Sequence, residues 1–304
     1  MTTLAPAATR AGSGSSSPAR RGASSVPSLL GLAPFAVYLL LFLALPTLIA
    51  IGSGFIDDDG RLTFENVAAL GDPVIVQTFW NSTWLSLLTA VIGAVVGALA
   101  CYAMLGLPAG GRMRSLVDAA SGVLAQFGGV MLAFAFIATM GLQGVVTLLL
   151  RDAFGIDLFA EGAWIYGLPG LILPYIYFQV PLMIITFMPA MSALKPQWAE
   201  ANLTLGGTPF GFWTKIGLPV LAPSFFASFL LLFANAFSSY ATAAALASQG
   251  SQIVPLQIRT ALTSETVLGR ENLAGALALG MILVMAAVMW LYSLVQRRAA
   301  RWQR

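Results

Sequence analysis

The chain has 304 residues, of which 58% are hydrophobic and 9% are charged, and its mean hydropathy is +0.85. Since an average soluble protein is about 25% charged, this composition excludes a pair of ordinary soluble domains. A single cysteine, Cys101, excludes a disulfide framework, and the lack of histidine argues against a zinc or haem site.

Six runs of 25 to 43 residues contain no charged side chain. A membrane-spanning helix needs about 20 mostly apolar residues, so each run is long enough to cross a bilayer. The sequence therefore predicts an all-α polytopic membrane protein with six transmembrane helices. The predicted spans cover residues 29–55, 78–105, 119–141, 164–190, 219–243 and 273–295.

Residues 1–28 are rich in Ala, Ser, Gly and Pro. They predict a disordered basic cytoplasmic tail ahead of a six-span domain over residues 29–304. A secretory signal peptide is the alternative, but the apolar run over 29–55 exceeds a signal core of about 7–15 residues. We therefore expect the first span to be retained.

The charged residues indicate the orientation of the spans. Eleven of the 15 basic residues, but only two of the 12 acidic ones, fall in the two tails and in the loops over 106–118 and 191–218. Lys and Arg are retained on the cytoplasmic side, so both termini are predicted to be cytoplasmic, in a cell membrane of bacterial type. The pI of about 9.2 then reflects orientation, and we expect membrane lipid rather than nucleic acid as a partner.

Several of the runs are longer than one crossing requires. Two short spans over 216–258 would give seven spans and place the Arg-rich C-terminal tail outside, against the charge bias. One span followed by a polar extracytoplasmic segment at 248–252 fits better. The surplus at 142–150 predicts an interfacial or partly inserted helix.

The long cytoplasmic loop over 191–218 carries helix signals. Lys195-Pro196 can begin a helix, and Gly206-Gly207 can end it with a left-handed residue. Thr208-Pro209 can then begin a second helix.

Three large apolar side chains follow in that second helix. Phe210, Trp213 and Ile216 lie at three-residue spacing, which places them on one face. This pattern favours a docking element at the membrane surface. The alternative is an interfacial helix that only joins two spans.

The loop contains a spaced motif: Glu200-Ala201, then Gly206 six residues after the Glu, then Ile216 and Leu218-Pro219. In these residues and in its place before the penultimate span, the chain resembles the permeases of binding-protein-dependent ABC importers, whose EAA motif has this spacing. Two positions depart from the motif. Asn202 stands where a second Ala is usual, and Gly207 stands where Ala often follows the Gly.

The resemblance extends beyond the loop. The segment FENVAAL at 64–70, the Asp72-Pro73 pair and the Asn81-Ser82 pair are similar to the spermidine/putrescine-type permeases and to their ferric-iron, thiamine and phosphonate relatives. The resemblance covers about residues 29–300 and implies a MetI-like core. It also implies a polyamine or similar small solute.

The family likeness implies a coupling helix over 198–205 that seats in a groove of a separate ATPase subunit, with Glu200 contacting the ATPase. The alternatives are that Glu200 only caps the helix, and that the prolines at 219 and 223 only kink the next span. The residues that the resemblance assigns to ATPase coupling are Glu200, Ala201, Leu205, Gly206, Ile216 and Pro219.

The resemblance implies three kinds of protein partner: an ABC ATPase dimer, a second permease, expected to be a paralogue, and an extracytoplasmic solute-binding protein. No Gly-rich phosphate loop precedes Lys195 or Lys215. We therefore expect no enzyme activity, no catalytic residues, no metal and no cofactor in this chain, with ATP bound by the partner. The rival classes are a secondary transporter or channel and a membrane scaffold.

No charged residue lies within a predicted span, which argues against a self-contained secondary transporter. Polar side chains in the spans are therefore the candidates for the solute path, although interhelical hydrogen bonding is the more common role of such groups. Gly93 and Gly97 predict a packing face, and the acidic residues at 57–59 predict a solvated loop or a docking point. The path candidates are Asn81, Gln126, Gln179, Asn235 and Tyr240, with Gln143, Ser238 and Ser239 beside them.

The charge distribution makes a topology prediction. Reporter fusions in the 58–70 loop should report an extracytoplasmic position, and fusions at the C-terminus should report a cytoplasmic one, because the basic residues gather on that side. Either fusion on the opposite side would contradict the six-span map.

Overall fold

The computed structural model describes residues 25–57, 59–108, 110–160, 162–247, 253–263 and 271–300. Residues 1–24 of the predicted tail, Asp58 and the polar segment at 248–252 lie outside the described residues. Helix α1 begins at Ser25, so the last four residues of the predicted tail are helical.

The chain divides into two compact units, Met1–Ile49 and Ala50–Arg304. In the first unit, α1 (Ser25–Leu39) leads through a π-helical turn, η1 (Leu40–Ala44), into α2 (Leu45–Ser53), which ends in the second unit. The Thr47 hydroxyl donates a hydrogen bond to the Leu43 carbonyl at 2.6 Å, so its polar group is satisfied within the helix.

The second unit holds the other helices. They are α3 (Glu65–Ala68), η2 (Ala69–Gly71), α4 (Pro73–Leu105), α5 (Arg112–Gln126), α6 (Gly129–Met140), α7 (Val145–Phe154), η3 (Trp164–Tyr166), α8 (Leu168–Ser192), α9 (Pro196–Thr204), α10 (Pro209–Phe212), η4 (Trp213–Gly217), α11 (Leu218–Phe237), α12 (Ala241–Leu246), α13 (Val254–Thr263) and α14 (Glu271–Ala300).

Six helical stretches are long and apolar enough to cross a membrane, which confirms the predicted number of spans. They are Leu32–Ser53, Pro73–Leu105, Gly129–Phe154, Leu168–Ser192, Pro209–Leu246 and Asn272–Leu294. The second begins earlier than predicted because Asp72 caps α4, its carboxylate accepting a hydrogen bond from the Val74 amide at 2.9 Å.

The predicted third span, 119–141, is wrong in its boundaries. Helix α5 ends at Gln126, and α6 starts at Gly129, whose φ of +71° only glycine adopts readily. The chain therefore breaks inside the predicted span. The surplus segment is a separate helix, α7, as expected for 142–150, although it runs to Phe154.

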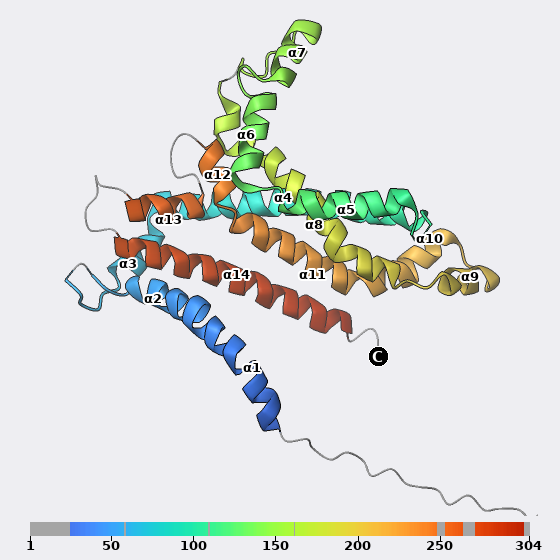
Figure 1. Cartoon of the computed structure of the whole chain (residues 1–304), viewed down its shortest axis with the longest axis horizontal. Helices are drawn as coiled ribbons and strands as arrows, with labels where there is room; N and C mark the ends of the chain where they lie inside the picture. Colours follow the sequence, from blue (N-terminus) through green and yellow to red (C-terminus); the bar gives the residue numbers. More distant parts are fainter. Residues whose placement is uncertain are drawn as a thin grey trace, which may run out of the picture. The chain divides into compact units, whose positions relative to one another are not determined.

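Helix α8 is the centre of the second unit. It packs against α4, α5 and α11, while α14 packs against α13 and α11, and α6 pairs with α12 (Figure 1). Three prolines, Pro174, Pro181 and Pro189, lie inside α8, and the helix continues through all of them.

The contact between α4 and α8 depends on two glycines one turn apart. A Cβ added at Gly93 would lie 2.7 Å from Gln179 Cβ, and one added at Gly97 would lie 2.5 Å from Met183 Cβ. Small residues let helix backbones approach closely in a bilayer, where dispersion contacts drive association. The predicted packing face is therefore confirmed.

Gly97→Ala should destabilise the bundle by about 1–3 kcal/mol, since the new methyl group overpacks the α4–α8 contact. Gly122→Ala on α5 is the matched control, because nothing lies within 4 Å of a Cβ there. It should be neutral or stabilise by up to about 1 kcal/mol. Thermal unfolding in detergent compares the two, and equal melting temperatures would contradict the packing argument.

Candidate functional site

Helix α9 ends in a fully hydrogen-bonded turn. Gly206 has a φ of +79°, its amide donates to the Leu203 carbonyl at 3.0 Å, and the Gly207 amide donates to the Asn202 carbonyl at 2.8 Å. These are the two bonds of a Schellman cap. Gly206 therefore holds a sharp, defined turn at the far end of the loop.

Asn202 and Gly207, the two departures from the motif, are in contact. A Cβ at Gly207 would collide with the Asn202 amide, lying 2.6 Å from its Cγ. The Asn202 Nδ2 donates to the Thr208 carbonyl at 3.1 Å and so links α9 to the start of α10. The Asn side chain occupies the space that an alanine at 207 would need, which explains why both positions differ together.

The second helix of the loop begins as predicted and continues into the fifth span. The Thr208 Oγ1 accepts from the Gly211 amide at 3.1 Å and caps α10. The π-helical turn η4 then joins α10 to α11 without an interruption. Of the three residues predicted to share a face, Phe210 is exposed, whereas Trp213 and Ile216 are half-buried. Trp213 and Ile216 lie in the π turn, which departs from the α-helical register that the spacing assumes.

Trp213 anchors this helix to the bundle. Its ring lies edge-on to Tyr102 of α4 with centroids 5.2 Å apart. It also covers Gly217, where a Cβ would lie 2.6 Å from the Trp213 ring. Ile216 is half-buried, and Pro219 is exposed at the start of α11.

The outer face of the loop is apolar and exposed. The relative exposure is 88% for Leu205, 78% for Phe210 and 55% for Leu203. Glu200 and Ala201 are exposed on α9 as well. Isolated surface apolar groups are ordinary, but several together at a polar rim mark an interaction surface.

Glu200 does not cap its helix. The N-cap position is Lys195, no side chain caps the turn there, and Glu200 is the fifth residue of α9. The alternative of a capping role alone is therefore wrong.

At the opposite end of the bundle from α9 (Figure 1), the fifth span breaks between α11 and α12. The Tyr175 hydroxyl of α8 donates to the Ser239 carbonyl at 2.9 Å, and the Gly129 amide donates to Thr242 Oγ1 at 2.9 Å. The breaks before α6 and before α12 are thus braced by neighbouring helices, as backbone at membrane depth requires.

The predicted path residues fall into different environments. Gln179 is fully buried, and its Nε2 donates to Thr89 Oγ1 at 2.7 Å across the α4–α8 contact. Its Oε1 has no hydrogen-bond partner among the described residues. Asn81 Oδ1 accepts from Gln77 Nε2 at 2.9 Å on the same helix. These contacts suit helix packing more than solute contact.

Gln126, Asn235 and Tyr240 are exposed. Gln126 is the last residue of α5, next to its break. Tyr240 shares a hollow with Ser238 and Arg259. Arg259 was not predicted as a path residue, because it lies outside the charge-free runs. The only sequence signal for it is its position directly after the longest run, 216–258.

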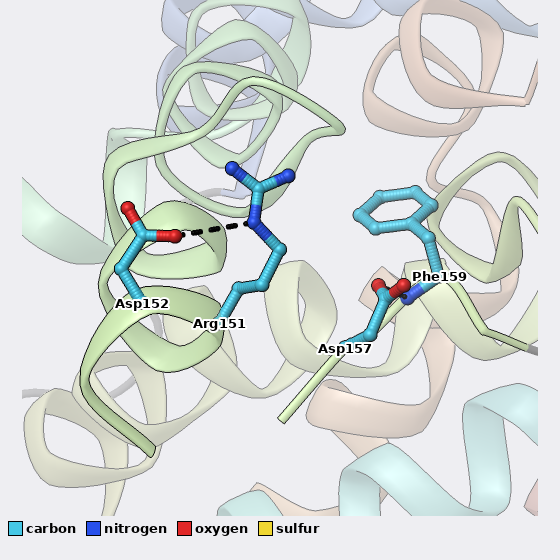
Figure 2. Close-up of polar contacts among 4 residues, drawn as sticks. All are labelled: Arg151, Asp152, Asp157 and Phe159. Carbon is cyan, nitrogen blue, oxygen red and sulfur yellow. Dashed lines mark hydrogen bonds and ion pairs between the residues drawn. The ribbon is translucent and has the colours of Figure 1, made fainter. Parts of the chain in front are cut away.

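The charged side chains of the segment after α6 are satisfied locally. Figure 2 shows Arg151 Nε paired with Asp152 Oδ1 at 3.2 Å, and Asp157 accepting from the Phe159 amide at 2.8 Å. In the 57–59 segment, the Asp57 carboxylate accepts from the Arg61 amide at 2.7 Å and closes a turn. Among the described residues, no group of three or more metal-ligating side chains forms.

The chain matches no protein-family model. Over 248 residues it is 29% identical to the trehalose transport system permease protein SugB of Mycobacterium tuberculosis, covering 79% of this chain and 81% of that one. Over 267 residues it is 23% identical to the spermidine/putrescine transport system permease protein PotB of Haemophilus influenzae, covering 84% and 89%.

The fold also has a solved counterpart. A chain of a bacterial alginate ABC transporter, in complex with an alginate pentasaccharide-bound periplasmic protein, superposes with a TM-score of 0.72 at 17% identity, covering 90% of this chain and 95% of that one. The chain is similar in sequence and in fold to the permeases of ABC importers. It is a multi-pass membrane protein with a MetI-like fold.

The contact between Asn202 and Gly207 predicts a compensating pair of substitutions in this permease. Gly207→Ala alone should open the loop, whereas Asn202→Ala with Gly207→Ala should restore it, with a coupling energy of about 1 kcal/mol. Trypsin cleavage after the exposed Lys215, on the loop side of membrane vesicles, measures this opening. Additive effects of the two substitutions would contradict the contact.

Proposed function

We propose that the chain forms half of the solute path of an ATP-driven importer and is coupled through α9 to a separate ATPase subunit. The observation that carries the proposal is an exposed apolar tip, Leu203, Leu205 and Phe210, held on a rigidly capped turn. A tip of this kind fits a groove on a partner, because its cap leaves little backbone freedom to lose on binding.

The loop is connected to the path by continuous helix. From Pro209 to Phe237 the chain is helical without a gap, through α10, η4 and α11. Trp213 fixes the near end against Tyr102, and the break at 238–240 lies at the far end. A displacement of α9 by a partner would therefore move the fifth span as a lever. The far end of that lever would shift the backbone at the break over 238–240.

In this proposal, ATP hydrolysis and solute passage take place on different protein chains that meet at the apolar tip of α9. The partner binds and hydrolyses ATP. When that partner closes, the fifth span changes its packing both at the α9 end and at the break over 238–240. A second permease, which we expect to be a paralogue, completes the path, and an extracytoplasmic binding protein delivers solute. The relatives are named for trehalose and for spermidine/putrescine, so the solute must be argued from residues of this chain.

A secondary transporter or channel is the rival function. Coupling sites of such transporters usually contain ionisable groups within the spans, and the six charge-free runs contain none. An external energy source is consistent with that composition.

Leu205→Asp should weaken ATPase binding at least about tenfold, because it places a charge at the centre of an apolar contact. Leu62→Asp is the matched control, since Leu62 is 87% exposed but lies in the loop that we expect on the other side of the membrane. Co-purification of the ATPase subunit and ATP hydrolysis by the complex are the measurements.

Glu200→Lys and Gly206→Pro should also lose ATP-dependent transport while the protein still inserts, since Pro cannot adopt the φ of +79° at Gly206. Normal hydrolysis and transport in the Leu205, Glu200 and Gly206 variants would refute the coupling role of α9. Equal losses in Leu62→Asp would show a general folding defect instead of a lost contact.

A further inference from the structure

A hollow of about 430 Å³ lies at the break in the fifth span. Ser238 and Tyr240 of the break form one side, α13 forms another, and Met281 of α14 closes it. Pro255, Ile258 and Leu262 give it apolar walls, and Thr263 adds one more hydroxyl-bearing side chain. Apolar walls with a few polar groups are the common composition of small-molecule sites.

The break that forms one side of this hollow is built into the fold. The Ser239 carbonyl is held by the Tyr175 hydroxyl, and the Ser238 hydroxyl donates to the Ala234 carbonyl at 2.9 Å. Irregular backbone at membrane depth is tolerated where it is buried in protein or lines a water-filled cavity. Asn235, one turn earlier on α11, is exposed and extends a polar strip from the hollow.

Arg259 is the one charged residue among those that line the hollow. Its guanidinium offers five N–H donors and no acceptor, and the side chain is exposed. The phenol of Tyr240 and the hydroxyl of Ser238 are neutral. The hollow therefore favours oxygen acceptors and repels ammonium groups.

We propose that Ser238, Tyr240 and Arg259 form a solute-contact site in the outer half of the path, for a solute that presents carboxylate or hydroxyl oxygens. This inference rests on the proposed importer function and deepens it. It departs from the expected polyamine, because a polyamine carries several ammonium groups that Arg259 would repel. The described acidic residues of the 57–59 segment, Asp57 and Asp59, are not among the residues that line the hollow.

The charge preference of the hollow can be measured without knowing the solute. In the complete importer, Ser238→Cys is labelled with two methanethiosulfonates, one bearing a sulfonate and one a trimethylammonium group. Cys101 is the chain's only cysteine and is buried, so the importer without Ser238→Cys gives the background. Each rate is divided by the rate of the same reagent with a free thiol, and labelling is followed by the mass of this subunit.

We expect a normalised preference for the anionic reagent of at least about threefold. Adding Arg259→Gln should remove it, and adding Arg259→Glu should reverse it. Arg151→Glu is the matched control, a charge reversal on α7 away from the hollow, and should leave the preference unchanged. Equal normalised rates at Ser238→Cys, or rates that do not respond to Arg259→Glu, would overturn the proposal.

The solute class has a direct test in uptake by the unaltered importer with its binding protein. ATP-dependent uptake of trehalose or of an alginate oligosaccharide would support the class and distinguish hydroxyl from carboxylate oxygens. ATP-dependent spermidine uptake would overturn it. The labelling is done without ATP, so its result does not depend on coupling to the ATPase. The comparison of Leu205→Asp with Leu62→Asp tests that coupling and does not involve the hollow, so failure of one proposal can be told from failure of the other.

Discussion

The hydrogen-bonding needs of the backbone constrain this permease most strongly at the places where its helices stop. Within a bilayer, a free amide or carbonyl costs several kcal/mol. The chain breaks between α5 and α6, just before Gly129, and the fifth span breaks after Phe237. Both breaks are satisfied from outside their own helix, by Thr242 Oγ1 and by the Tyr175 hydroxyl. Because Thr242 lies on α12, its bond to the Gly129 amide also joins α12 to the start of α6, and these two helices pack together.

The number of spans was predictable because length and charge alone decide whether a segment can cross a bilayer. The break at residues 127–128 was not predictable in this way. Gly128 and Gly129 lie inside a charge-free run, and the hydropathy and charge of the whole run do not reveal two glycines within it. Similarly, spacing alone did not predict that Phe210 is exposed while Trp213 and Ile216 are half-buried. Helical spacing assumes 3.6 residues per turn, and the π turn η4 alters it just where the loop enters the membrane.

The candidate sites were predictable to different degrees for a related reason. The EAA motif lies in consecutive residues of one loop, so spacing alone located Glu200 and Gly206. The sequence shows Asn202 and Gly207 only as two departures from the motif. Their contact was not predictable, because it depends on the turn at Gly206. Tyr240 lies at the break before α12 and Arg259 lies on α13, and only the fold places them at one hollow.

The apolar tip on α9 and the hollow at the fifth-span break lie towards opposite ends of the continuous helix from Pro209 to Phe237. This arrangement suggests a structural role for the two departures from the motif, Asn202 and Gly207. A coupling helix transmits force only if the joint between α9 and α10 is stiff. Here the Asn202 amide bonds across the joint to the Thr208 carbonyl, and Gly207 gives it room. The added side-chain bond ties α9 to the lever that ends at the break beside Ser238 and Tyr240. Under the proposed coupling, a movement at Leu205 would be carried into α11 instead of being absorbed at the glycines.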